Sequence, residues 1–410
     1  MRIQSMMAMS ANFLHKKRAG DVIRNLKVQT FQGRRVLVTG GSGFVGIHLG
    51  RALHLLGAKV TLFDKAKPLE DYDPDIKVVQ GDIRDREVLE KLCEGVDCVF
   101  HIASYGMSGR EMLKSSEFIE SINVGGTENI IEACIKENVT RLVYTSTHNV
   151  VFAGQDIDNG DETLPLLPLS AHKDDYSRSK SMAEQLAMKS NGRQTKDGSL
   201  LNICVIRPVA IYGAGEQRHF PRIVKNMEQG LLCMKIGGSH IKVPWVHVDN
   251  LVNGHILAAE GLSRHKEHIA AGQVYFIADK APVNQFEFLR PLITGLGYHY
   301  PSLVVPVWFM YIIAFLTEWL HTILKPVIDF QPLMTRTELF QVAVTHHFSI
   351  EKARKQLGYE PEERDLTDMV QYFLERGHRK KSSSIGTFLV TLLLGVLFVM
   401  LLMSLLPLVG

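Results

Sequence analysis

Residues 36–46, VLVTGGSGFVG, decide the fold class of this chain. The stretch begins with an apolar, β-branched run that is typical of a buried parallel strand. Three glycines then follow at intervals of three, and the next residues place Val45, Leu49 and Leu53 on one face of a helix. A strand, a glycine turn and a helix in this order predict a dinucleotide-binding unit.

The glycines of this turn have separate predicted roles. Gly40 makes the tight turn, Gly43 lets the backbone approach a pyrophosphate, and Gly46 lets the helix pack closely on the sheet. Phe44 and Val45 begin the helix, whose free N–H groups and positive dipole end are expected to face the phosphates. Neither GKS nor GKT follows the turn, which excludes a nucleoside-triphosphate P-loop.

Two acidic residues after the following strands are candidates for binding the adenosine half of the dinucleotide. Asp64 ends the strand VTLFD, and a carboxylate about 20 residues past the glycines binds a ribose 2′-hydroxyl and repels a 2′-phosphate. This favours NAD over NADP, although Lys65 beside it weakens the preference and a strand-end cap is the alternative role of Asp64. Asp82 and Ile83, after the third strand, lie where the adenine ring is expected.

Alternating strand and helix patterns predict an α/β fold with a doubly wound parallel (Rossmann) sheet over residues 34–213. Helical patterns dominate residues 214–376, which predict a smaller C-terminal substrate lobe. Residues 303–324 within it are apolar, but Pro306 and Glu318 argue against a full membrane span. We expect a helix that lies in the membrane interface or roofs a lipid-facing pocket, and therefore a sterol or steroid substrate drawn from the bilayer.

Both ends of the chain differ in composition from the rest. Residues 1–33 are rich in Lys and Arg and predict a flexible basic arm or, alternatively, an organelle presequence. Residues 385–410 form an uncharged run of 26, longer than the roughly 20 residues that cross a bilayer as a helix. This predicts a single-pass transmembrane tail anchor over 385–409, after a basic linker at 377–384. The positive linker favours a cytosolic catalytic domain, and we expect the membrane to be that of the endoplasmic reticulum.

A candidate catalytic pair follows the strand RLVYTST. Tyr176 is the one tyrosine of eleven that has a lysine, Lys180, four residues further on, so the two side chains share a helix face. A phenol has a pKa of about 10, and a nearby ammonium favours its ionised form. Tyr176 can then take a proton from an alcohol while hydride leaves the same carbon. Thr145, Ser146 and Thr147 offer a hydroxyl that orients the substrate oxygen.

Several motifs in chain order resemble those of an extended short-chain dehydrogenase/reductase. They are TGGSGFVG, GDI, HIAS, INVGGT, VYTST, YSRSK and RPVAIYG, and with VHVDNL and FSIEKARKQLGYEP the similarity covers roughly residues 34–376. The stretches FHIASYGMSGRE and RLVYTSTHNVVF, together with the apolar tail, resemble the 3β-hydroxysteroid dehydrogenase branch and, within it, family 42E. The resemblance implies a membrane-anchored, NAD-dependent enzyme that oxidises a hydroxyl of a steroid or sterol.

The resemblance also assigns roles residue by residue. Tyr176 matches the catalytic acid/base, and Lys180 matches its partner, which also contacts the nicotinamide ribose. Thr147 matches the position usually held by a catalytic serine, because YTST stands where the steroid branch has YTSS. The hydroxyl remains, but the added methyl group is expected to narrow the pocket. The three glycines of the turn and the two aspartates match contacts to NAD.

The composition limits the other partners. A net charge of +3 gives no reason to expect nucleic acid binding. Five cysteines without a CxxC pair indicate buried thiols, and 17 histidines without an HExxH pattern predict no metal site. A homodimer is compatible with the sequence.

Three functions remain open from the sequence. The first is an NAD-dependent 3β-hydroxysteroid dehydrogenase, with or without a coupled isomerase step. The second is a nucleotide-sugar epimerase or reductase, which shares the fold and the Tyr/Lys pair and would be favoured by a polar, Arg-rich pocket. The third is a non-catalytic, membrane-tethered NAD-binding scaffold, against which the intact Thr147, Tyr176 and Lys180 count.

Overall fold

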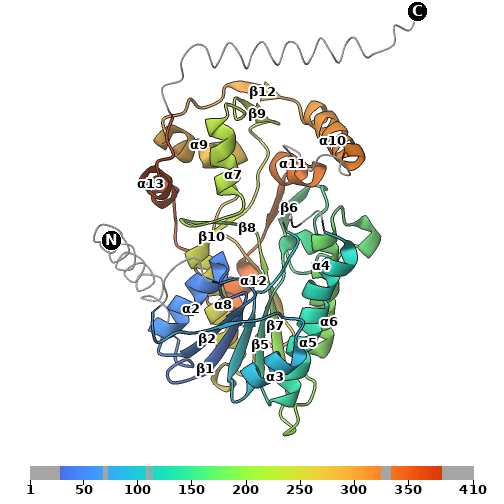
Figure 1. The fold of residues 1–410 in the computed structure, drawn as a ribbon, viewed down its shortest axis with the longest axis vertical. Helices are drawn as coiled ribbons and strands as arrows, with labels where there is room; N and C mark the ends of the chain where they lie inside the picture. The colour runs from blue at the N-terminus through green and yellow to red at the C-terminus, as the bar shows by residue number, and fades with distance from the viewer. Residues whose placement is uncertain (1–27, 68–72, 108–110, 112–113, 325–333, 381–410) are drawn as a thin grey trace, which may run out of the picture.

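A seven-stranded parallel sheet forms the core of the larger lobe, in the lower part of Figure 1. A computed structural model describes residues 28–67, 73–107, 111, 114–324 and 334–380. The strands lie in the order β11-β7-β5-β4-β1-β2-β3. Their bounds are β1 (Arg35–Thr39), β2 (Lys59–Asp64), β3 (Lys77–Gln80), β4 (Cys98–His101), β5 (Arg141–Thr145), β7 (Asn202–Pro208) and β11 (Val274–Ile277). The order reverses at β1, so the predicted doubly wound, Rossmann-type sheet is confirmed.

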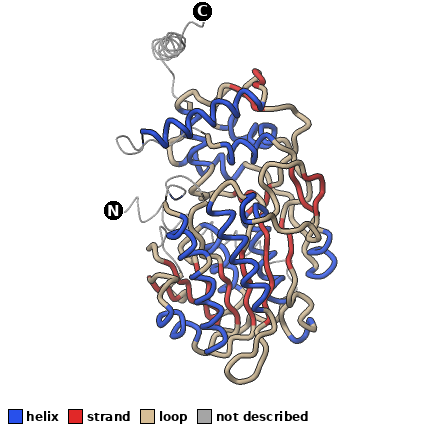
Figure 2. The backbone as a smooth tube through the Cα atoms, turned by 90° about the vertical axis from the view of Figure 1, so that its right-hand side faces the viewer, coloured by secondary structure: helices blue, strands red, loops and turns tan. Residues whose placement is uncertain are grey.

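Helices cover both faces of this sheet (Figure 2). On one face α2 (Phe44–Leu55) packs against α8 (Val248–Gly261), and the other face carries α3 (Arg86–Cys93), α5 (Gly125–Lys136) and α6 (Asp175–Ser190). The side chains of β1 alternate between the two layers: Val36 and Val38 join the core under α2 and α8, whereas Leu37 joins the core under α5 and α6. Because both faces are buried, β1 is apolar along its length, as its sequence indicates.

The second lobe is built around three helices, α7 (Phe220–Glu228), α9 (Gln285–Gly295) and α13 (Thr367–Glu375), which share one apolar core. The chain between α7 and α9 returns to the sheet, where α8 packs on α2 and β11 pairs with β7. The predicted boundary at residue 213 is therefore too early for the sheet. The seventh strand of this sheet, β11, is hydrogen-bonded to β7, which lies far from it in the chain. No local sequence pattern reveals such a pairing.

Shorter elements connect the sheet to the second lobe. Three two-stranded sheets pair β8 (Ala210–Tyr212) with β10 (Trp245–His247), β9 (Met234–Ile236) with β12 (Leu303–Val305), and β6 (Ile157–Gly160) with β13 (His346–Phe348). The remaining α-helices of the described residues are α4 (Ser116–Asn123), α10 (Val307–Leu324), α11 (Arg336–Ala343) and α12 (Glu351–Leu357).

Residues 28–33 belong to the fold and not to a flexible arm. Phe31 is buried, and its ring centroid lies 6.3 Å from that of Phe100. The hydroxyl of Thr30 donates a hydrogen bond to Glu260 of α8. The predicted arm over residues 1–33 is thus too long at its C-terminal end, because burial of an aromatic side chain stabilises this segment against the sheet.

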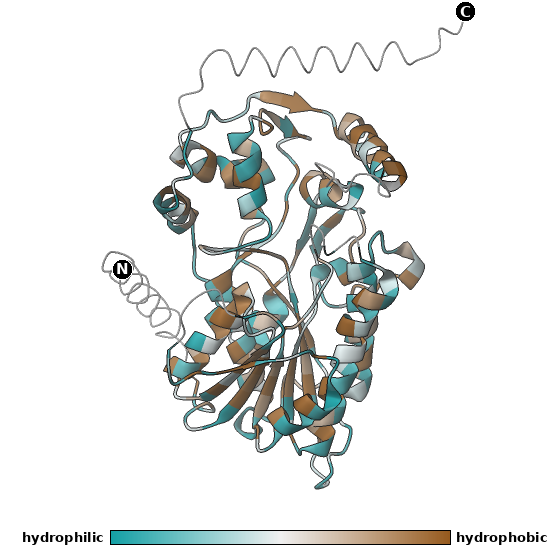
Figure 3. Cartoon of the chain, viewed as in Figure 1, coloured by the Kyte–Doolittle hydropathy of each residue, from teal (hydrophilic) through white to brown (hydrophobic). Residues whose placement is uncertain are grey.

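Many residues of α10 are hydrophobic (Figure 3), and several of their side chains are exposed. Trp308 is 65% exposed, Leu316 52% and Trp319 58%, and Leu303 of the preceding β12 is 60% exposed. Within the described residues, no helix has the length and apolar character needed to cross a membrane. The predicted tail anchor over residues 385–409 lies outside the described residues.

Candidate active site

The glycine turn joins β1 to α2 through close backbone contacts. Gly40 has φ +72°, which favours glycine, and a Cβ there would lie 2.8 Å from the backbone nitrogen of Ala103. A Cβ on Gly46 would lie 2.1 Å from the carbonyl oxygen of Gly40, so only glycine allows α2 to pack this closely on the turn. A Cβ on Gly43 would meet the same oxygen at 3.2 Å, a much milder contact. Internal packing therefore requires Gly40 and Gly46 more strongly than Gly43.

The beginning of α2 suits a bound anion. Gly43 caps the helix without a side chain, and the first turn, which includes Phe44 and Val45, contains no acidic residue. The Ser42 hydroxyl is buried and has no hydrogen-bond partner among the described residues. Free N–H groups, the positive end of the helix dipole and an unused hydroxyl together fit the pyrophosphate of a dinucleotide.

Asp64 lies beside this turn at the end of β2. Its Oδ2 accepts a hydrogen bond from the N–H of Ser42 at 3.0 Å, and its Oδ1 accepts one from the N–H of Ala66 at 2.9 Å. The carboxylate therefore braces the backbone, as the strand-end cap interpretation requires. Each oxygen retains a lone pair that can accept a ribose hydroxyl, so the two predicted roles of Asp64 are compatible.

Asp82 is engaged by two basic side chains. Arg84 Nη2 lies 2.7 Å from its Oδ2, and Lys65 Nζ lies 3.0 Å from the same oxygen. These hydrogen bonds, Arg84 first, hold the pKa of Asp82 well below its usual range. From the sequence, Lys65 was expected to weaken the preference for NAD. In the structure its ammonium is paired with Asp82. Ile83 is buried, and a Cβ on Gly126 of α5 would lie 2.7 Å from its Cγ2.

Tyr176 and Lys180 lie in the first two turns of α6 and are 6% and 2% exposed. The helix begins after Asp174, whose side chain accepts a hydrogen bond from the N–H of Ser177 at 2.7 Å. The Lys180 ammonium donates to the carbonyl oxygen of Thr145, the last residue of β5, at 2.5 Å. Both predicted catalytic side chains are therefore buried near the carboxyl end of β5, the edge at which open α/β sheets bind ligands.

Burial is the largest cause of the pKa shifts of Tyr176 and Lys180. It raises the pKa of Tyr176 to about 12, while Arg218 and Ser104 lower it. Burial lowers the pKa of Lys180 to about 7, while Glu184 raises it. The sequence predicted that Lys180 lowers the pKa of Tyr176. That effect stays a prediction: the Lys180 ammonium donates to a backbone carbonyl, and the positive charge of Arg218 lowers the pKa of Tyr176.

The three hydroxyls of YTST have different partners. Thr145 Oγ1 shares a hydrogen bond with His255 Nε2 at 2.8 Å, and Ser146 Oγ donates to Glu184 at 2.5 Å. Thr147 Oγ1 accepts a hydrogen bond from the backbone N–H two residues on, at 3.2 Å. That bond leaves the hydroxyl hydrogen of Thr147 available to a substrate oxygen, which favours Thr147 over its two neighbours.

The loop after β4 connects the glycine turn to Tyr176. Ala103 lies against Gly40, and the side chain of the next residue, Ser104, lowers the pKa of Tyr176. Asn123 fixes this loop through two hydrogen bonds of 2.8 Å to the backbone of the residue after Ser104. The predicted cofactor turn and the predicted acid/base therefore border the same short segment.

Sequence reasoning missed two charged groups near this pair. Glu184 forms a buried ion pair with Arg207 at 2.5 Å, and its position four residues after Lys180 was an available signal. Arg218 forms an ion pair with Glu111 at 3.6 Å. Arg218 and Glu111 are distant in the chain and belong to different lobes, so no local sequence pattern connects their ion pair to the site.

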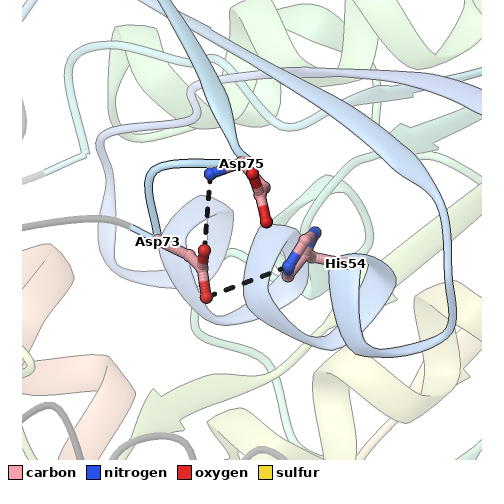
Figure 4. A group of neighbouring side chains, drawn as sticks. All are labelled: His54, Asp73 and Asp75. Carbon is pink, nitrogen blue, oxygen red and sulfur yellow. Dashed lines mark hydrogen bonds and ion pairs between the residues drawn. The ribbon is translucent and has the colours of Figure 1, made fainter.

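One group of side chains has the composition of a cation site (Figure 4). His54, Asp73 and Asp75 place one potential ligand atom each within 4.8 Å of one another. His54 lies near the C-terminal end of α2, about 15 Å along the helix from the glycine turn. The three residues are partly or fully exposed, and such acidic groups are common without an ion. They have no place in the chemistry of Tyr176.

Comparison with known proteins agrees with the motifs. A model of the 3-beta hydroxysteroid dehydrogenase/isomerase family matches residues 37–307. The chain is 50% identical over 377 residues to short-chain dehydrogenase/reductase family 42E member 1 of Danio rerio, covering 91% of this chain and 97% of that protein. It is 36% identical over 363 residues to a 3 beta-hydroxysteroid dehydrogenase/Delta 5-->4-isomerase of Mycobacterium tuberculosis, covering 85% of this chain and 93% of that protein.

Solved structures share the fold at lower identity. The crystal structure of gox2253 has a TM-score of 0.66 at 25% identity and covers 85% of this chain and 100% of its own. DesIV, a dTDP-glucose 4,6-dehydratase from Streptomyces venezuelae solved with NAD and TYD bound, has a TM-score of 0.61 at 24% identity and covers 84% of this chain and 99% of its own. Fold, family match and relatives agree: the chain belongs to the 3-beta hydroxysteroid dehydrogenase/isomerase family and is an NAD-dependent dehydrogenase/reductase.

Proposed function

We propose that this enzyme oxidises a hydroxyl group of a steroid or sterol at a membrane surface, with NAD as hydride acceptor and Tyr176 as acid/base. The observation that carries the proposal is the loop after β4. Ala103 in this loop lies against Gly40 of the glycine turn. Asn123 hydrogen-bonds the backbone of the same loop and also donates a hydrogen bond to Ser179 in the helix that carries Tyr176. A dinucleotide held at the turn and an alcohol held at Tyr176 would therefore meet at this loop.

The side chains of the site have different proposed roles in alcohol oxidation. Tyr176 takes the hydroxyl proton as the carbon–oxygen single bond becomes a carbonyl. Thr147 donates its free hydroxyl hydrogen to the substrate oxygen and orients it. Lys180, buried and anchored on Thr145, places its charge behind the reacting groups. NAD, when bound, supplies the acceptor for the hydride that leaves the same carbon.

The preference for NAD over NADP rests on Asp64. Its carboxylate lies at the end of β2 and contacts the glycine turn through Ser42. A 2′-phosphate at this position would be repelled by the carboxylate, whereas a ribose 2′-hydroxyl would donate a hydrogen bond to it. Lys65, the nearby positive charge that favours a phosphate, is paired with Asp82.

The steroid or sterol substrate and the membrane location are supported by the apolar surfaces of the second lobe. The exposed side chains of α10 and β12 form an apolar face of the kind that lies in a membrane interface. The uncharged residues 385–409 would anchor the chain, and the basic residues before them would stay in the cytosol. The relative from Mycobacterium tuberculosis, which is named for a steroid reaction, supports the same substrate class.

A nucleotide-sugar epimerase or reductase is the second candidate, and one observation favours it. The positive charge of Arg218 lowers the pKa of Tyr176. A guanidinium near the acid/base could hold a phosphate. Against it, Arg218 is already paired with Glu111, and the second lobe presents a broad apolar face.

The direct test uses the full chain in detergent with NAD. A 3β-hydroxysteroid such as dehydroepiandrosterone should give NADH, measured by its absorbance, and UDP-glucose should give neither NADH nor UDP-galactose. Conversion of UDP-glucose without oxidation of any hydroxysteroid in a panel would overturn the proposal in favour of the second candidate. For topology, protease added to intact microsomes should digest the catalytic domain, and full protection would contradict a cytosolic domain.

A further inference from the structure

A glutamine of the second lobe contacts the turn that follows Thr147. Gln341 lies in α11, and its Nε2 donates a hydrogen bond to Asn149 Oδ1 at 2.9 Å. Its Oε1 lies 3.2 Å from His148 Nε2, with which it shares a hydrogen bond. His148 and Asn149 directly follow Thr147 and lie 193 and 192 positions before Gln341 in the chain. One side chain therefore holds both residues next to the proposed orienting hydroxyl.

The turn itself has few strong hydrogen bonds of its own. It is a single 3₁₀ turn (His148–Val150) that Thr147 caps by accepting a hydrogen bond from the N–H of Asn149 at 3.2 Å. The bond from the N–H of Val150 to the carbonyl oxygen of Thr147 is long, at 3.4 Å. Because 3₁₀ turns have poorer hydrogen-bond geometry than α-helices, contacts from outside the turn help to fix the direction of the Thr147 hydroxyl.

His148 is held from two sides. Its Nδ1 shares a hydrogen bond of 3.2 Å with the carbonyl oxygen of Pro208 at the end of β7, and its Nε2 is bonded to Gln341. The ring also stacks on that of His346, which follows α11, with the ring centroids 5.5 Å apart. Because the His148 ring is buried, water does not reach it to replace a lost partner, and both nitrogens depend on these contacts.

The helix that carries Gln341 is anchored in the second lobe by other residues. Leu339 and Ala343 are buried in a core that also contains residues of β9 and α9. Thr335 and Glu338 form a capping box at the start of the helix. Since α11 does not need Gln341 to keep its place, it serves as a fixed support from which this side chain reaches the turn after Thr147.

Gln341 also borders the helix that carries Tyr176. It lines a small cavity together with Asn149 and with Ser177, the residue after Tyr176. The cavity therefore lies between α11, the turn after Thr147 and the beginning of α6. This places the glutamine between the second lobe and the two groups that would act on the substrate hydroxyl.

We propose that Gln341 is a positioning residue for Thr147: by holding His148 and Asn149, it keeps the Thr147 hydroxyl directed at the substrate oxygen. The inference rests on the proposed role of Thr147 in alcohol oxidation. It makes turnover depend on the placement of α11, and so gives the second lobe a part in the chemistry besides substrate binding.

The test compares Gln341→Met, Thr147→Ala and the double variant with the wild type. Methionine keeps the length of the side chain and removes both hydrogen bonds. Gln341→Met should lower kcat for a 3β-hydroxysteroid by about tenfold and leave the affinity for NAD within about twofold, because the orientation of the substrate oxygen suffers and cofactor contacts do not. In the Thr147→Ala background it should change kcat by less than about twofold, since no hydroxyl is left to position. Equal losses in both backgrounds would overturn the inference.

The matched control is Gln356→Met. Gln356 is a half-buried glutamine of α12 that accepts a hydrogen bond from the Tyr275 hydroxyl at 2.8 Å, and so contacts β11 and not the turn after Thr147. Turnover should stay at the wild-type level in this variant. A loss as large as that in Gln341→Met would show that removing any such hydrogen bond lowers turnover, and would overturn the inference.

A second variant covers the case in which Gln341→Met does not fold. Asn149→Ala breaks the same contact from the other side and keeps the backbone N–H that bonds Thr147. It should lower kcat by a smaller factor, because Gln341 still holds His148, and only where Thr147 is present. The same loss in the Thr147→Ala background would again contradict a positioning role.

A measurement without substrate separates this inference from the proposed function. In protein labelled with carbon-13 at the threonine methyl groups, the methyl resonance of Thr147 is assigned by its absence in Thr147→Ala. This resonance should shift in Gln341→Met and stay in place in Gln356→Met, and an unchanged resonance in Gln341→Met would overturn the inference. Oxidation of the steroid at the wild-type rate by Thr147→Ala would overturn the proposed role of Thr147 instead, whatever the resonance shows.

Discussion

The glycine turn at residues 40–46 and the second-lobe loop at residues 213–220 lie close together, since a Cβ on Gly213 would lie 3.3 Å from the ring of Phe44, but they are held in different ways. The turn is held by backbone packing, since a Cβ on Gly46 would lie 2.1 Å from a carbonyl oxygen. The loop is held by carboxylates: Glu216 accepts hydrogen bonds from three backbone N–H groups, and Asp368 accepts one from a fourth. The close packing in the turn admits only glycine, whereas a substitution of a carboxylate in the loop can weaken its hydrogen bonds without abolishing them. Substitutions should therefore act as all-or-none in the turn and as graded changes in the loop.

The largest effect is expected in the turn. Gly46→Ala should weaken NAD binding by about 100-fold or more, because overpacking of this kind costs about 1–3 kcal/mol even where neighbours can relax, and here the neighbour is backbone. Calorimetric titration with NAD measures the effect. Gly125→Ala is the matched control in another helix, since a Cβ there would meet nothing within 4 Å. Equal NAD binding by Gly46→Ala and the wild type would contradict the claim that the packing of the turn admits only glycine at this position.

The next effect concerns the hydroxyl of Thr147, which we propose orients the substrate oxygen. Thr147→Ala should lower turnover by about 100-fold to 1000-fold, the range for losing one oriented donor, and Thr147→Ser should stay within about tenfold of the wild type. Turnover of a hydroxysteroid with NAD is the measurement. Ser146→Ala should cost less, because Ser146 donates to Glu184 and not to substrate. A larger loss in Ser146→Ala than in Thr147→Ala would show that the wrong hydroxyl has been assigned.

A smaller effect is expected in cofactor choice on the strand side of the turn. NAD should bind at least about tenfold more tightly than NADP, because a hydrogen bond from the ribose to Asp64 is replaced by repulsion of a phosphate. Dissociation constants for the two cofactors test this. Tighter binding of NADP would mean that Lys65 leaves Asp82 to bind the phosphate.

The smallest effect on activity is expected in the loop. Glu216→Gln should lower the free energy of unfolding by about 1–3 kcal/mol, because charge-assisted bonds to three N–H groups are weakened, and turnover should remain within about tenfold. Thermal unfolding measures this, with the exposed neighbour Gln217→Ala as control. Complete loss of activity in a folded Glu216→Gln protein would show that the loop is as intolerant as the turn.

The parts of the molecule that were predictable are those encoded within a few residues. The strand, turn and helix around residues 36–46 follow from hydrophobic pattern and glycine spacing, and the pairing of Tyr176 with Lys180 on one helix face follows from their spacing of four. The role of Gly40 in the turn could be anticipated because a positive φ depends on the residue itself.

The parts that were not predictable depend on contacts between distant residues. β11 joins the sheet through β7, and Phe31 fills a place beside Phe100, so the predicted boundaries at residues 213 and 33 were both misplaced. The pairing of Arg218 with Glu111 is of the same kind. Lys180 shows a third case: its place on the helix face was predicted, but the bond of its ammonium to the carbonyl oxygen of Thr145 was not.

The most direct test of the account is the substitution Tyr176→Phe, with NAD binding and steroid oxidation measured on the same preparation. The change removes one hydroxyl and little contact area, so the affinity for NAD should stay within about twofold to threefold of the wild type. Oxidation of the hydroxysteroid should be abolished, because the group that takes the proton is gone. A Tyr176→Phe protein that binds NAD and oxidises the steroid at the wild-type rate would contradict the proposed chemistry.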